Sequence, residues 1–293
     1  MEENSSEIAY FDQPPSYQES TQNERLTNFI NKYEVSQLFA DKLMLLSNFK
    51  IVFIFDDSGS MNSTLSESPL NTGNFNATRW DELQYFSKIS IELANIFNHN
   101  GTDIYFLNRP PARNIRSADE LVTHFHDKPS GYTQLTPILN EVLNNNNRDM
   151  LADKKLLIII VTDGEPTDFN GRVDIKSFKE GLNKRNNRTF TTIVSCTDDE
   201  ETMKYLNNWD IIIPRLDVVD DYRSEKREVQ NVQGKSFSFS FGDYVTKALL
   251  GSIDESIDNL DQNLSLNLNF KFFNNYKDTV AKEYSNSSIV IVD

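Results

Sequence analysis

The sequence predicts an α/β fold in which a doubly wound, mostly parallel sheet is flanked by helices. Short continuous apolar runs, the clearest at 51–55 and 156–161, predict strands that are covered on both faces, as the strands of parallel sheets are. Amphipathic segments separate these runs. Strands that alternate with helices require right-handed crossovers, and such a sheet binds ligands beyond the carboxyl ends of its strands.

Each element of this fold follows from its own pattern. Apolar runs predict strands at 51–55, 103–107, 156–161 and 190–195, and a short strand nearer the edge at 211–213. Apolar residues at helical spacing predict helices at 83–96, 118–125, 137–143, 173–182 and 244–260.

Composition divides the chain into four parts. Residues 1–24 are polar and rich in Pro, Ser, Gln and Glu, which predicts a disordered arm. We expect a helical lead-in at 25–47 and the α/β domain at 48–260. The C-terminal extension, 261–293, alternates apolar and polar residues, so it forms either edge strands or a loosely held tail.

Charge and cysteine content exclude several classes of protein. The formal net charge is −15, and an acidic surface repels nucleic acid and anionic membranes, so we expect neither as a partner. A single cysteine, Cys196, leaves no intramolecular disulfide and no cysteine-rich zinc site. The start of the chain lacks a secretion signal and no apolar run is long enough for a transmembrane segment, so we expect a cytoplasmic protein.

Oxygen-bearing side chains follow the first buried strand at alternate positions. The segment 56–60 reads Asp-Asp-Ser-Gly-Ser, so that Asp56, Ser58 and Ser60 face one point while Gly59 lets the backbone fold closely. Carboxylates and hydroxyls are the ligands that Mg²⁺ prefers. This segment alone is also ordinary turn chemistry.

Two further segments strengthen the metal interpretation. Asp163 and Gly164 follow the second buried strand, at the mouth of what should be a neighbouring strand. Thr133 lies in a loop just before a predicted helix. With these residues in this order, a divalent cation site formed by Asp56, Ser58, Ser60, Thr133 and Asp163 becomes the leading hypothesis.

This set resembles the metal-ion-dependent adhesion site of von Willebrand factor type A (vWA) and integrin inserted domains. The resemblance covers about 48–260 and includes the segments 79–82, 162–168 and 216–227, which look like an intracellular branch of the family in microbial eukaryotes. Tyr132 departs from the pattern, because many members have a second glycine there.

The resemblance implies both the ligands and the function. Ser58, Ser60 and Thr133 would contact Mg²⁺ (or Mn²⁺) directly, whereas Asp56 and Asp163 would act largely through bound water. An open coordination position would then accept a carboxylate from a partner protein. The implied protein is a non-enzymatic interaction module.

Two other functions stay open. A metal-assisted hydrolase would need a general base, for which Asp57 and Glu165 are the candidates. A structural subunit with a vestigial metal site is the third hypothesis. A haloacid-dehalogenase-type phosphatase is excluded, because Ser58 stands where that class needs a second aspartate.

Other metal or nucleophile candidates are weaker. His124 and His126 are two positions apart in a predicted helix and do not share a face. Cys196 ends a buried strand and is better explained as a small core residue. The acidic residues Asp217, Asp220 and Asp221 cap or solvate helices, with a second ion site as the alternative.

The N-terminal arm carries a motif of its own. Pro14, Pro15 and Tyr17 match the Pro-Pro-x-Tyr pattern, which resembles ligands of WW domains. In the resemblance such motifs recruit ubiquitin ligases to adaptors. A WW-domain protein is therefore a second expected partner.

Overall fold

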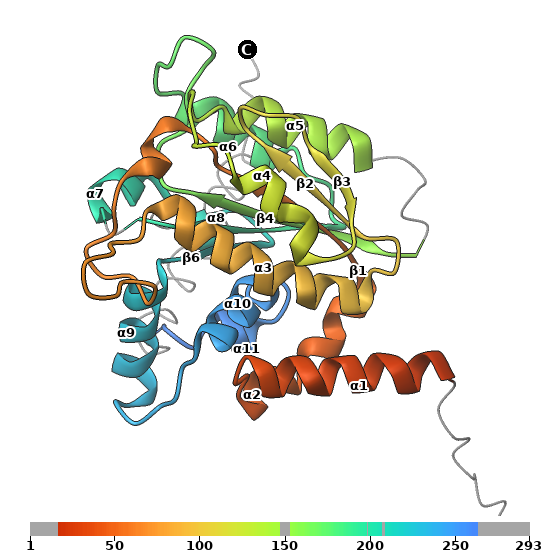
Figure 1. Ribbon diagram of the computed structural model, residues 1–293. Coiled ribbons are helices and arrows are strands. Elements are labelled where there is room, and N and C mark those ends of the chain that lie inside the picture. Colours follow the sequence, from red (N-terminus) through yellow and green to blue (C-terminus); the bar gives the residue numbers. More distant parts are fainter. Residues whose placement is uncertain (1–16, 147–152, 198, 207–208, 263–293) are drawn as a thin grey trace, which may run out of the picture.

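Six strands form one sheet in the order β3-β2-β1-β4-β5-β6 in the computed structural model, which describes residues 17–146, 153–197, 199–206 and 209–262. All neighbouring strands are parallel except β2 and β3. The predicted doubly wound α/β fold is confirmed (Figure 1). The strands are β1 (Phe49–Phe55), β2 (Thr102–Phe106), β3 (Ala112–Ile115), β4 (Lys155–Thr162), β5 (Thr189–Ser195) and β6 (Leu216–Val219).

Helices cover both faces of the sheet (Figure 1). They are α1 (Tyr17–Lys32), α2 (Gln37–Ala40), α3 (Arg79–Phe97), α4 (Val122–Phe125), α5 (Leu135–Asn146), α6 (Ile175–Asn183), α7 (Glu200–Met203), α8 (Trp209–Ile212), α9 (Tyr222–Gln233), α10 (Phe241–Leu250) and α11 (Glu255–Asp258). Short 3₁₀ turns are η1 (Leu43–Asn48), η2 (Gly59–Asn62), η3 (Ala118–Leu121) and η4 (Lys204–Leu206).

The alternation of side chains along each strand gives the sheet two cores. In β1, Ile51, Phe53 and Phe55 pack with α1, α3 and α10, whereas Val52 and Ile54 pack with α5, α6 and the segment around α8. All five side chains are fully buried. Burial on both faces explains why the strand reads as a continuous apolar run rather than an alternating one.

The helical lead-in packs on the α3 and α10 side of the sheet. Leu26 and Phe29 of α1 are buried in that core, as the predicted helix required. The helix begins at Tyr17, however, so helical structure starts earlier than the predicted boundary near residue 24. The expected arm and C-terminal extension lie mostly in 1–16 and 263–293, outside the described residues.

Three elements differ from the sequence prediction. Residues 209–212 form helix α8 instead of the predicted strand at 211–213, and the edge strand is β6. Three consecutive isoleucines carry no periodicity, so they could not distinguish the two structures. The predicted closing helix 244–260 is interrupted after Leu250 and resumes as α11, because Asp254 caps a new helical turn. The antiparallel strand β3 was not predicted.

No helix in the described ranges is both long and apolar enough to cross a membrane.

Candidate metal centre

The two aspartates of the predicted metal set leave adjacent parallel strands. Phe55 of β1 is in register with Val161 of β4, and the Asp56 amide donates to the Val161 carbonyl at 2.9 Å. The chain places β2 and β3 on one side of β1, and β4 to β6 on the other. The carboxyl ends of β1 and β4 therefore lie at the switch point of the sheet, where doubly wound proteins bind ligands.

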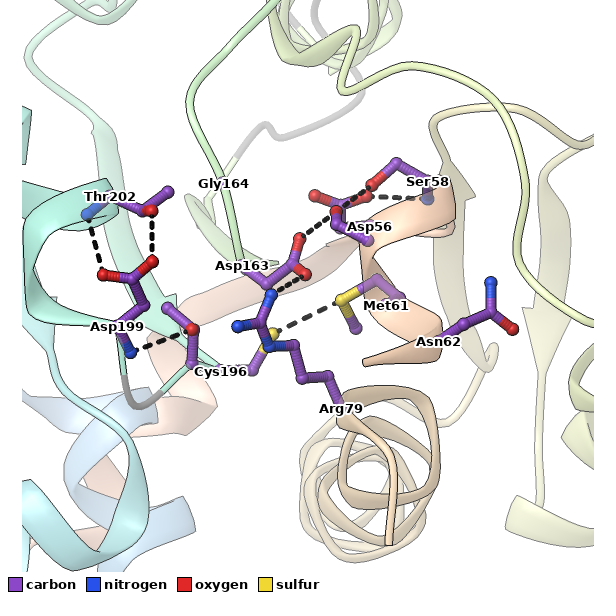
Figure 2. A network of polar contacts seen from close by, with 12 residues as sticks. Asp56, Ser58, Met61, Asn62, Arg79, Asp163, Gly164, Cys196, Asp199 and Thr202 are labelled. Carbon is purple, nitrogen blue, oxygen red and sulfur yellow. Dashed lines mark hydrogen bonds and ion pairs between the residues drawn. The ribbon is translucent and has the colours of Figure 1, made fainter. Parts of the chain in front are cut away.

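A continuous run of hydrogen bonds joins four of the predicted ligands. The Asp56 carboxylate accepts from the Ser58 amide at 2.8 Å and from the Thr162 hydroxyl at 2.6 Å. The Ser58 and Ser60 hydroxyls are 3.0 Å apart, and Ser60 Oγ donates to Asp163 Oδ1 at 2.8 Å. Asp56 and Asp163 face one another across this group in Figure 2. The structure therefore brings together residues that the sequence separates widely.

Thr133 reaches the same place on a neighbouring loop. The Gly59 amide donates to the Gly131 carbonyl at 3.1 Å, which ties this loop to the one after β1. The Thr167 amide donates to the Thr133 carbonyl at 2.8 Å, which ties it to the loop after β4. A Cβ built on Gly164 would lie 3.8 Å from Thr133 Oγ1, so the threonine hydroxyl lies against the Asp163-Gly164 turn.

Burial makes the pair of carboxylates electrostatically costly without a cation. Asp56 and Asp163 are 0% and 1% exposed. Burial, followed by the negative charge of Asp163, raises the pKa of the Asp56 carboxyl to about 7. A cation between the two carboxylates would relieve this repulsion.

Arg79 holds the outer side of the Asp163 carboxylate. Its Nη1 donates to Asp163 Oδ2 at 2.7 Å, and Figure 2 shows the guanidinium directed at this carboxylate. Arg79 opens α3, whose first turn is fixed by a reciprocal capping box between Thr78 and Asp81. The segment 79–82 is part of the resemblance, but the sequence pattern predicts no role for Arg79, because spacing alone does not reveal an ion pair.

Asp57 contacts the loop after β2 rather than the candidate metal ligands. Its Oδ2 accepts from Arg109 Nε at 2.6 Å and its Oδ1 from the Asn108 amide at 2.8 Å. Arg109 Nη1 also donates to the His124 carbonyl at 2.6 Å. Asp57 thus fastens the loop after β2 to the loop after β1. A carboxylate held in this way is poorly placed to act as the general base that a hydrolase would need.

The chemistry of the donor set fits a hard divalent cation. Two carboxylates and three hydroxyls offer oxygen ligands alone, as Mg²⁺ and Mn²⁺ prefer. In the part of the chain that the structure describes, no group of three or more His, Cys, Asp or Glu side chains is arranged to hold a metal ion. The hydroxyls of Ser58, Ser60 and Thr133 are therefore required to complete any site here.

The structure does not support the alternative second ion site. Asp221 caps α9, with its carboxylate accepting from the Arg223 and Ser224 amides. Asp217 is buried in β6 instead, where a Cβ on Gly251 would collide with its carboxylate. Two of the three predicted acidic residues are thus separated, with Asp221 at a helix cap and Asp217 in the interior.

The histidines and the cysteine also have structural explanations. The His124 ring stacks on Phe106 with centroids 5.8 Å apart, whereas His126 is exposed beside Asp127. Burial raises the pKa of the Cys196 thiol, whose Sγ lies 3.6 Å from Met61 Sδ. Cys196 is thus a buried core residue as predicted, and the two histidine rings have separate surroundings.

The predicted arm motif is only partly described. Pro14 and Pro15 lie outside the described residues, and Tyr17 is the first residue of α1.

The fold and the polar group at its switch point define a doubly wound α/β protein with a cluster of oxygen ligands above β1 and β4. No model of a known protein family matches this chain, and a search of curated proteins also found no match.

Proposed function

We propose that the chain contains a vWA-like interaction module that binds Mg²⁺, or Mn²⁺, at this edge of the sheet and uses it to bind a carboxylate of a partner protein. The observation that supports it most is the hydrogen-bond run from Asp56 through Ser58 and Ser60 to Asp163. It joins two neighbouring strand ends with the order of residues that the resemblance requires.

Each side chain has a separate part in this proposal. Ser58, Ser60 and Thr133 would hold the cation through their hydroxyls, and Asp56 and Asp163 would hold its bound water. A bound Mg²⁺ supplies an electrophilic point for a carboxylate oxygen. Thr162 and Arg79 orient the two aspartates by donating to their outer oxygens.

An interaction module fits the surroundings better than a hydrolase does. Of the two candidate bases, Asp57 is held by Arg109 and Asn108. Glu165 remains as a candidate, and metal-dependent turnover that is lost in Glu165→Gln would favour the hydrolase instead.

The N-terminal motif supports a second partner within the same proposal. Pro14, Pro15 and Tyr17 precede or open α1, and this end of the chain would offer a Pro-Pro-x-Tyr ligand to a WW domain. The test is binding of the full chain to an isolated WW domain, compared with Tyr17→Ala. Equal binding by both proteins would remove this part of the proposal.

Titration calorimetry of the full chain with MgCl₂ tests the metal site. Ser58→Ala and Thr133→Ala should each abolish measurable uptake, because each removes a hydroxyl ligand. Ser63→Ala is the matched control, since this exposed serine lies just beyond η2 and is not a predicted ligand. Uptake that is equal in all four proteins, or absent from the wild type, would overturn the proposal.

A further inference from the structure

Arg79 places a positive charge directly on one carboxylate of the candidate metal centre. The Arg79 Nη1 and Asp163 Oδ2 atoms are 2.7 Å apart, and the two side chains are 14% and 0% exposed (Figure 2). The backbone of Arg79 is fixed at the start of α3, where its amide donates to the Ser63 carbonyl at 3.0 Å. An ion pair so shielded from water is little weakened by salt.

The contacts of Arg79 differ from those of a purely structural arginine. Arg185 is such an arginine: its guanidinium donates to the carbonyls of Leu182, Pro214 and Arg215, and it carries no ion pair among the described residues. Arg79 instead directs its charge at Asp163, and its buried Nε has no hydrogen-bond partner. The guanidinium is therefore placed for its charge on the carboxylate more than for saturation of its donors.

The charge of Arg79 changes the net formal charge of the candidate metal centre. Asp56 and Asp163 bring two formal negative charges and Arg79 one positive charge, which leaves −1. Within the described ranges Asp56 forms no ion pair, and the charge of Asp57 is offset by Arg109 at 2.6 Å. A divalent cation would leave this set at +1, and a carboxylate from outside would return it to zero.

We propose that Arg79 is an internal counter-ion that weakens cation binding by the free protein and couples it to the arrival of a partner carboxylate. The inference rests on the proposed metal site and adds a regulation to it. Arg79 repels the incoming cation and already neutralises one of its carboxylates. Once the cation is bound, the net charge of +1 favours binding of a carboxylate. The cation and the partner carboxylate therefore each raise the affinity for the other by the same factor. The charge of Arg79 thus makes the site responsive to its partner.

The sign of the effect of Arg79→Gln provides the test. We expect Arg79→Gln to bind Mg²⁺ roughly tenfold more tightly than the wild type in titration calorimetry, because the repulsion is removed. Added Mg²⁺ should also raise the Tm of this variant more than that of the wild type, because Asp163 has then lost the counter-ion Arg79. A merely structural role predicts the reverse, since a disturbed site binds more weakly. Arg79→Lys keeps the charge and should bind Mg²⁺ with an affinity close to that of the wild type.

A second measurement needs no variant. The apparent Mg²⁺ affinity of the wild type should rise when potassium acetate replaces potassium chloride at the same ionic strength, and acetate should have less effect on Arg79→Gln. Equal or weaker Mg²⁺ binding by Arg79→Gln, Arg79→Lys that behaves like Arg79→Gln, or no effect of acetate on the wild type would each overturn the inference. Failure of the wild type to bind Mg²⁺ under any of these conditions would instead overturn the proposed function.

Discussion

Substitution of Lys247 by methionine tests the buried cluster that this lysine forms with Glu225 and Asp261. Lys247 of α10 is 0% exposed, and its Nζ lies 2.9 Å from Glu225 Oε1 and 3.2 Å from Asp261 Oδ2. Burial raises the pKa of nearby Asp217 well above its usual value, even though Lys247 acts to lower it. Loss of the lysine would leave buried carboxyl groups without their cation.

We expect Lys247→Met to lower the free energy of unfolding at pH 7 by about 3–5 kcal/mol, the usual cost of breaking a buried pair by removing one partner. For a domain of this size, that corresponds to a fall in Tm of roughly 6–20 °C. Methionine keeps the apolar stem of lysine, so little of the loss reflects packing. Urea unfolding followed by tryptophan fluorescence measures the change.

Two further variants make this result interpretable. Lys176→Met is the matched control, because the Lys176 side chain is 88% exposed and its pair with Glu180 is at the surface. Adding Asp261→Asn to Lys247→Met should recover part of the lost stability, since it removes a carboxylate that lies 3.2 Å from the lysine in the wild type. If Lys247→Met were no more destabilising than Lys176→Met, the cluster would not be held together by its lysine.

Three other predictions follow from the same structure. Burial raises the pKa of Glu225 to about 8 and of Asp258 to about 6, against ordinary values of 4.5 and 3.8. In the metal-free protein these two groups should therefore contribute stability that is complete below about pH 4 and is lost as the pH rises toward 8. Urea midpoints at several pH values measure this, and an identical slope in Glu225→Gln would contradict it. Gly131→Ala should weaken Mg²⁺ binding, because Gly131 has a φ of +100° and a Cβ there would lie 2.2 Å from Asn108 Oδ1. Gly234→Ala, with a φ of +104° and open space, is its control, and equal Mg²⁺ affinity in both variants would refute the loop argument. Gly242→Ala should cost about 1–3 kcal/mol, because its Cβ would lie 2.1 Å from the Tyr33 carbonyl oxygen. Unchanged urea unfolding of this variant would show that the lead-in is not firmly packed on α10.

The central strands could be predicted from the sequence because strands that are buried on both faces consist almost entirely of apolar residues. The runs 51–55 and 156–161 are buried on both faces, and a strand between two layers of helices is continuously apolar for that reason. The segment 211–213 has the same composition, yet Ile211 and Ile212 are 37% and 51% exposed on α8. Whether such a short run lies inside or outside depends on its neighbours in space, which composition does not give.

The candidate site was predictable where its residues share one loop or follow one rule of topology. Asp56 and Asp163 could be placed together, because both follow buried strands and parallel strands end at the same edge. Arg79 and Arg109 could not be placed. Each forms an ion pair with a residue far away along the chain, and no rule of topology predicts that the two side chains meet. Thr162 could have been found, because it is the last residue of β4 and its hydroxyl faces the neighbouring strand end.

Anomalous diffraction from crystals of the full chain soaked in MnCl₂ tests the metal site most directly. We predict one strong peak among the oxygens of Ser58, Ser60 and Thr133, next to the Asp56 and Asp163 carboxylates, and no peak there in Thr133→Ala crystals. A map without a peak at this position, or with its only peak elsewhere on the acidic surface, would contradict the proposal that this edge of the sheet binds a divalent cation.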